Sequence, residues 1–138
     1  MTKKEGKPMN MKEFYSFFLP PNTLEYFDMK DMKVKEGKEK YLGKYSFDDE
    51  YTIVLVEKER LPEDRGKHEG KRLRTKGYTD ILLEDFPLRG RKTTLQYRIR
   101  KWQVEGEKGL FQRKIEIRTE GVKYTGEFAF FFEEGNRE

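Results

Sequence analysis

The sequence contains no cysteine and only one histidine, so it lacks the residues that most often bind zinc in proteins. The absence of cysteine also excludes disulfides and thiolate nucleophiles. No apolar run approaches the roughly 20 residues that span a bilayer, and no signal-peptide apolar segment follows the charged first eight residues. We therefore expect a cytoplasmic protein with no metal, no cofactor and no membrane partner.

The motifs of common enzymes are also missing. The only serines, Ser16 and Ser46, do not lie in a Gly-x-Ser-x-Gly turn, and His68 has no second histidine or cysteine near it. The carboxylates Asp80 and Glu84 lie among many basic residues, so ordinary ion pairing explains them more simply than a two-metal nuclease site. The sequence predicts a binding protein and not an enzyme.

The composition predicts one small domain with an aromatic core. Of the 138 residues, 41% are charged, but 14% are aromatic, which is enough to favour folding over disorder. We assign residues 10–134 to a single domain and residues 1–9 and 135–138 to flexible tails. Net charge is −1 over residues 1–59, +7 over residues 60–101 and −2 over the remainder, so the positive excess lies in the middle third.

The N-terminal part predicts two short helices followed by strands. Asn10 and Glu13 have the spacing of a capping box, which places a helix start at Asn10, and Pro20 ends that helix. A second helical turn over residues 22–27 leads into a strand over residues 28–34. The β-branched run at residues 51–57 predicts a central strand that is buried on both faces.

The C-terminal half predicts a β-hairpin and a third strand. Strands over residues 78–86 and 92–104 are joined by a turn in which Pro87 comes first and Gly90 takes a positive φ. A further strand covers residues 110–118. The fold class is therefore α+β: a small antiparallel sheet, built as a meander of hairpins, with short helices near the N- and C-termini.

The second hairpin strand carries the main candidate binding surface. Strand alternation places Leu95, Tyr97 and Ile99 on one face. The other face carries Gln96, Arg98, Arg100 and Trp102. Arginine grips phosphates or guanine edges and tryptophan stacks on bases, so this set suits double-stranded DNA, although a merely solvated basic surface is the open alternative. The candidate DNA-binding residues are Lys71, Arg72, Arg74, Lys76, Arg89, Arg91, Lys92, Gln96, Arg98, Arg100 and Trp102.

Five sequence blocks resemble the N-terminal region of bacterial insertion-sequence transposases. They are LPPNTLEYF at residues 19–27, KGYTD at 76–80, EDFPLRG at 84–90, RIRKW at 98–102, and EGVKYTGEFA at 120–129. The resemblance implies a non-catalytic component that recognises insertion-sequence ends, with the catalytic core further along or in a separate chain. Related transposases carry zinc-finger-bearing N-terminal domains, so this chain would be a cysteine-free relative in which an aromatic core replaces the metal.

The aromatic C-terminal segment is the second candidate site. Its residues form a helix capped by Thr125 or, equally well, an aromatic strand. A helix cannot bury all of its phenylalanines, so an exposed ring would favour self-association as a homodimer or docking of a catalytic subunit. The protein would then be an interaction module whose basic hairpin is only solvated. The candidate interface residues are Phe128, Phe130, Phe131 and Phe132.

Overall fold

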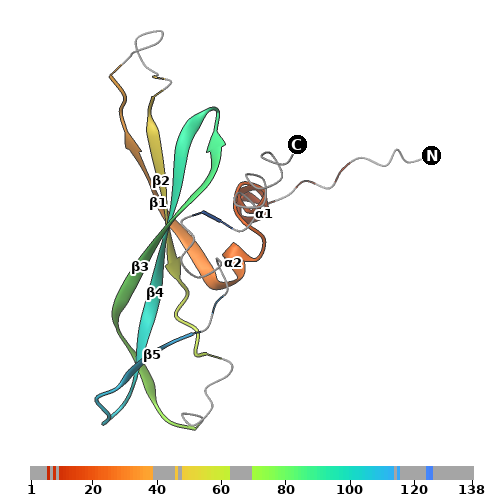
Figure 1. The fold of residues 1–138 in the computed structure, drawn as a ribbon. Helices are drawn as coiled ribbons and strands as arrows, with labels where there is room; N and C mark the ends of the chain where they lie inside the picture. The colour runs from red at the N-terminus through yellow and green to blue at the C-terminus, as the bar shows by residue number, and fades with distance from the viewer. Residues whose placement is uncertain are drawn as a thin grey trace, which may run out of the picture.

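Within the residues that the structure describes, two short helices and five strands make up an α+β fold, which confirms the predicted fold class (Figure 1). The computed structural model describes residues 6, 8, 10–38, 46, 48–62, 70–113, 115, 124 and 125. No helix among these residues is long and apolar enough to cross a membrane. The elements are α1 (Met11–Ser16), α2 (Thr23–Tyr26), β1 (Phe27–Lys35), β2 (Glu50–Glu57), β3 (Leu73–Leu88), β4 (Arg91–Val104) and β5 (Leu110–Gln112).

The predicted cap of the first helix is confirmed. The side-chain oxygen of Asn10 accepts a hydrogen bond from the backbone N–H of Glu13 at 2.8 Å, and the Asn10 amide donates to the Glu13 carboxylate at 3.1 Å. The C-terminal elements were placed less well from the sequence. β5 ends at Gln112 and not at residue 118, and the predicted helix or strand that begins at Thr125 lies almost wholly outside the described residues.

The sheet has the order β1-β2-β4-β3, with β5 pairing to β4. The pairs β1–β2, β3–β4 and β4–β5 are antiparallel, but β2 pairs with β4 in parallel. The predicted antiparallel meander is therefore wrong at this one pairing. Residues 58–72 separate β2 from β3 in the sequence, and the β3–β4 hairpin places its second strand, β4, beside β2.

The core lies on the face of the sheet toward α1 and α2, and Leu19 and the residues of α2 pack against it (Figure 1). Leu55 and Leu95 are fully buried there, and β2 has buried side chains on both faces, as predicted for a central strand. Thr23 of α2 is hydrogen-bonded to the hydroxyl of Tyr97 at 3.5 Å. Burial raises the pKa of the Tyr97 phenol to about 12.

The β3–β4 turn follows the prediction at its glycine but not at its proline. Gly90 has a φ of 79° and the preceding Arg89 a φ of 54°, the two positive values that a tight hairpin turn requires. Pro87 does not begin the turn. It lies inside β3, at the irregularity between Asp85 and Leu88, where the ladder is interrupted and a missing N–H is tolerated.

Candidate nucleic-acid interface

The solvent-facing side of the β3–β4 hairpin is electrically balanced near its turn. Arg98 Nε lies 3.4 Å from Asp80 Oδ1, and Lys92 Nζ lies 3.8 Å from Glu84 Oε1. Gln96 donates to Asp80 Oδ2 at 3.1 Å. The ion pairing predicted for the two carboxylates is confirmed. Because β3 places these acids beside the basic side chains of β4, the surface expected to be cationic has little excess charge here.

Two further arginines of the candidate set lie at the turn itself. Arg91 is half-buried, and its guanidinium donates to the backbone oxygens of Ser46 at 3.1 Å and Arg89 at 2.8 Å. Arg91 therefore holds the turn in place and has few donors left for a phosphate. Arg89 is exposed at the tip.

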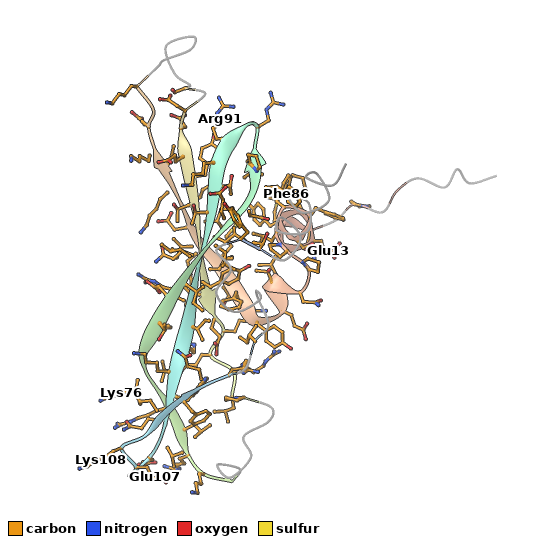
Figure 2. All side chains as sticks on the ribbon, in the orientation of Figure 1. Glu13, Lys76, Phe86, Arg91, Glu107 and Lys108 are labelled. Carbon is orange, nitrogen blue, oxygen red and sulfur yellow. The ribbon has the colours of Figure 1, made fainter. Side chains whose placement is uncertain are left out.

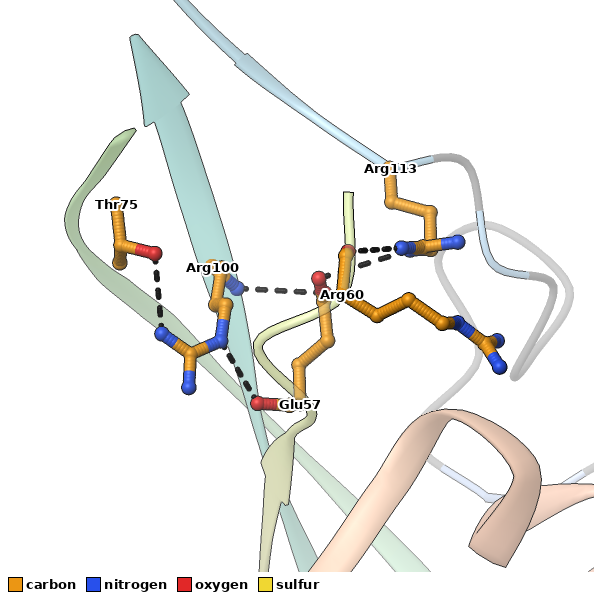
Figure 3. Close-up of polar contacts among 5 residues, drawn as sticks. All are labelled: Glu57, Arg60, Thr75, Arg100 and Arg113. Carbon is orange, nitrogen blue, oxygen red and sulfur yellow. Dashed lines mark hydrogen bonds and ion pairs between the residues drawn. The ribbon is translucent and has the colours of Figure 1, made fainter. Parts of the chain in front are cut away.

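Arg100 is also committed to contacts within the protein (Figure 3). Its Nε donates to the backbone oxygen of Glu57 at 2.8 Å, and its Nη1 donates to Thr75 Oγ1 at 3.0 Å. Its guanidinium carbon lies 5.2 Å from the centre of the Tyr78 ring. The main role of Arg100 is thus structural, since it joins the end of β2 to both strands of the hairpin.

A buried carboxylate that the sequence analysis missed fills a gap in the sheet. β2 ends at Glu57, whereas β5 pairs with β4 only from Lys101, so the N–H of Arg100 falls between the two partner strands. Glu57, which is 1% exposed, accepts that N–H through Oε1 at 3.4 Å. The only sequence signal is a carboxylate at the end of an apolar run, and nothing in the periodicity marks it.

Glu57 also pairs with a second buried cation. Its Oε2 lies 3.7 Å from Nε of Arg113, whose guanidinium donates to the backbone oxygen of Arg60 as well (Figure 3). Burial raises the pKa of the Glu57 carboxyl, while the hydrogen bond from Arg100 and the charge of Arg113 act in the opposite direction. The Trp102 indole also lowers the pKa of Glu57. Three buried atoms of this cluster have no hydrogen-bond partner among the described residues: Trp102 Nε1, Glu57 Oε2 and Arg113 Nε. The cluster is therefore buried, charged and incompletely hydrogen-bonded.

The prediction that Trp102 lies exposed on a cationic face is wrong, because this residue is 2% exposed. Up to Ile99 the buried positions of β4 are odd-numbered, but beyond it Trp102 and Val104 are buried. The hairpin is a strongly twisted ribbon (Figure 1), and a bulge at Lys76 and Gly77 adds to the twist. Because of this twist, the even-numbered side chains of β4 beyond Ile99 face the protein interior. Strand alternation alone therefore placed Trp102 on the wrong side.

The excess of positive charge lies at the other end of the hairpin, here called the basic end and defined as residues 70–76 and 101–112. This region holds six basic and two acidic side chains. Lys71 pairs with Glu107 at 3.7 Å, and Arg74 donates to Gln103. The remaining four basic residues form no ion pair with an acidic side chain of the described residues; they are Arg72, Lys76, Lys101 and Lys108.

The structure therefore separates the candidate DNA-binding residues into two groups. β3 has 16 residues and spans roughly 50 Å at about 3.3 Å per residue. Figure 2 shows Arg91 at one end of the hairpin, and Lys76, Glu107 and Lys108 at the other. Lys71, Arg72, Arg74 and Lys76 come together with Lys101 and Lys108, but not with the residues of the turn.

Two of the blocks that carry the transposase resemblance meet on the outer edge of β3. Thr125 is fully buried; its N–H donates to the backbone oxygen of Glu84 at 2.9 Å, and its hydroxyl donates to Asp85 at 2.8 Å. Tyr124 forms a parallel bridge with Glu84. The candidate interface that follows, Phe128, Phe130, Phe131 and Phe132, lies outside the described residues.

Within the part of the chain that the structure describes, no group of three or more histidine, aspartate or glutamate residues is arranged to hold a metal ion. Comparisons with family models, with curated proteins and with solved structures found no match to this chain.

Proposed function

We propose that the protein is a non-catalytic domain that binds double-stranded DNA through its basic end. The observation that carries this proposal is the clustering of six basic side chains with only two acids on residues 70–76 and 101–112, where most of the basic side chains have no ion-pair partner among the described residues. Basic side chains that are not neutralised within the protein can release counterions from a phosphate backbone when they bind it. The resemblance to transposase N-terminal regions makes insertion-sequence ends the proposed DNA.

The test is the salt dependence of duplex binding in paired variants from the two ends of the hairpin. If four or five phosphates are contacted, log K should fall with log salt with a slope of about −4 to −5. Arg72→Gln with Lys76→Gln should flatten this slope by about 2. Lys92→Gln with Arg98→Gln removes the same charge from side chains already paired with Glu84 and Asp80, and should leave the slope unchanged.

The outcomes of this comparison are distinct. If only the variant with Lys92→Gln and Arg98→Gln loses binding, the DNA interface lies on the half of the hairpin near the turn. Binding that is insensitive to both pairs, or no measurable binding at low salt, would refute the proposal and leave the basic end as a solubilising surface.

The alternative function, a protein-interaction module for a separate catalytic chain, has one observation in its favour. The first helix and the two residues after it expose four large apolar side chains: Met11 is 61% exposed, Phe14 45%, Phe17 74% and Phe18 49%. A cluster of this kind on a soluble domain is typical of a protein contact. Co-expression with the adjacent reading frame tests it, because Phe14→Ser with Phe17→Ser should abolish co-purification while leaving DNA binding intact.

A further inference from the structure

One arginine of the basic end differs from the other arginines of the long hairpin in what holds it. Arg91, Arg98 and Arg100 are bound by backbone oxygens or by a carboxylate. The guanidinium of Arg74 instead donates to a neutral side chain, because its Nε lies 3.4 Å and its Nη2 3.1 Å from Gln103 Oε1. Arg74 is exposed and forms no ion pair with an acidic side chain of the described residues. Its positive charge is therefore held in place without being neutralised.

The acceptor that holds Arg74 is itself fixed. Gln103 lies directly opposite Arg74 in the pairing of β3 with β4, and its Nε2 donates to the backbone oxygen of Glu107 at 2.8 Å. Its amide oxygen accepts both bonds from Arg74, which is the full capacity of that oxygen. The buried side chains of Trp102 and Val104 anchor the other face of the same strand. Gln103 therefore orients the guanidinium from a rigid support.

The edge of the Arg74 guanidinium that stays open is its terminal fork. A guanidinium carries N–H donors on Nε, Nη1 and Nη2 in a fixed planar arrangement. Gln103 takes the N–H of Nε and one N–H of Nη2, so the N–H groups of Nη1 and the second N–H of Nη2 remain. Guanine presents two neighbouring acceptors, O6 and N7, to an arginine fork of this kind, and it presents them only in the major groove.

The surroundings of Arg74 also suit the major groove. Leu110 of β5 lies in the same row, opposite Gln103, and is 49% exposed. An apolar side chain can contact the methyl group of thymine in the major groove, whereas it offers a phosphate nothing. The major groove is about 12 Å wide and admits a two-stranded β-ribbon, while the minor groove is only about 6 Å wide.

We infer that the basic end enters the major groove of duplex DNA and that Arg74, oriented by Gln103, reads a guanine there through O6 and N7. This inference rests on the proposed function and adds sequence specificity to it. Arg74 is then a specificity-determining residue, while Arg72, Lys76 and the other unpaired cations of the basic end supply affinity that does not depend on sequence.

The experiment selects preferred sequences from a randomised duplex pool and compares the wild type with Arg74→Gln and Arg72→Gln. Both arginines are exposed at the basic end, and both substitutions remove one positive charge. Arg74→Gln should lose a preference of about 10-fold to 100-fold at one guanine. Arg72→Gln should keep this preference and flatten the salt slope by about 1.

Modified DNA tests the contact in the unaltered protein, where no folding defect can interfere. Replacing the preferred guanine by 7-deazaguanine removes N7, and should weaken binding of the wild type but not of Arg74→Gln. Replacing it by inosine removes only the amino group in the minor groove, and should leave binding of the wild type unchanged.

The failures of the inference and of the proposed function are distinguishable. The inference is wrong if the wild type binds duplex without base preference, or if Arg74→Gln keeps the guanine preference. It is also wrong if 7-deazaguanine has no effect on the wild type, or if inosine weakens binding as much as 7-deazaguanine does. In each of these cases the proposed function stands. If no duplex is bound at all, the proposed function itself fails.

Discussion

Removing the Glu57 side chain should destabilise the fold far more than removing an exposed carboxylate from the same strand. Glu57→Ala leaves the buried guanidinium of Arg113 without its counter-charge and the N–H of Arg100 without its acceptor. Breaking a buried ion pair by deleting one partner typically costs about 3 to 5 kcal/mol. Glu50, at the other end of β2, pairs with Lys35 at 3.6 Å between side chains that are 42% and 82% exposed, so Glu50→Ala should cost no more than about 1 kcal/mol.

The assay is urea unfolding at neutral pH, in which the free energies of unfolding of the two variants are compared with a common m-value. Equal losses of stability in Glu57→Ala and Glu50→Ala would show that the buried cluster contributes nothing beyond a surface pair. That result would refute the argument that Glu57 closes the gap between β2 and β5.

The same carboxylate gives stability a predictable pH dependence. Burial raises the pKa of Glu57 above 4.5, so the folded state binds this proton more tightly than the unfolded state. The part of the stability that comes from this tighter proton binding is complete below pH 4.5 and is lost as the pH rises through the folded-state pKa, by about 1.4 kcal/mol per pH unit between the two pKa values. Glu57→Gln keeps an acceptor for the N–H of Arg100 and removes this dependence. A difference between wild type and Glu57→Gln that stays constant from about pH 4 to pH 8 would contradict the reasoning.

Three further predictions concern other buried side chains. Trp102→Ala should lower the free energy of unfolding by about 3 to 5 kcal/mol in urea denaturation; an unchanged stability would instead favour an exposed stacking role. Thr125→Val leaves a buried oxygen of Asp85 without its donor and should cost about 1 to 3 kcal/mol, and a double-mutant cycle with Asp85→Ala should show coupling between the two sites. In an ultraviolet pH titration, one tyrosine should ionise only near pH 12, and Tyr97→Phe should abolish that late step. The stabilisation from neutral Tyr97 is complete below pH 10 and disappears as the pH rises through about 12, so a late step that survives in Tyr97→Phe would assign it to another tyrosine.

Local sequence determined the features that depend on neighbouring residues. Asn10 and Glu13 specified the first helix cap, Gly90 specified the turn of the long hairpin, and the β-branched run of residues 51–57 specified a buried central strand. The helix cap and the turn depend on residues within a few positions, and the central strand depends on a run of apolar residues. Composition and spacing were therefore enough to predict all three.

Tertiary structure decided the features that depend on how distant strands meet. The parallel pairing of β2 with β4 joins two strands that have β3 between them in the chain, and no local pattern encodes such a pairing. Alternation placed Trp102 beside Arg98 on one face of β4, but the twist of the hairpin turned that face inward at Trp102 and left it exposed at Arg98. Charge counts located the positive middle third of the chain. Only the register of β3 against β4 showed that Asp80 and Glu84 pair with Arg98 and Lys92, so that among the described residues the cations without an ion-pair partner gather mainly at the basic end. Charge balance on a sheet is set by cross-strand neighbours, and these are fixed by the fold and not by position along the chain.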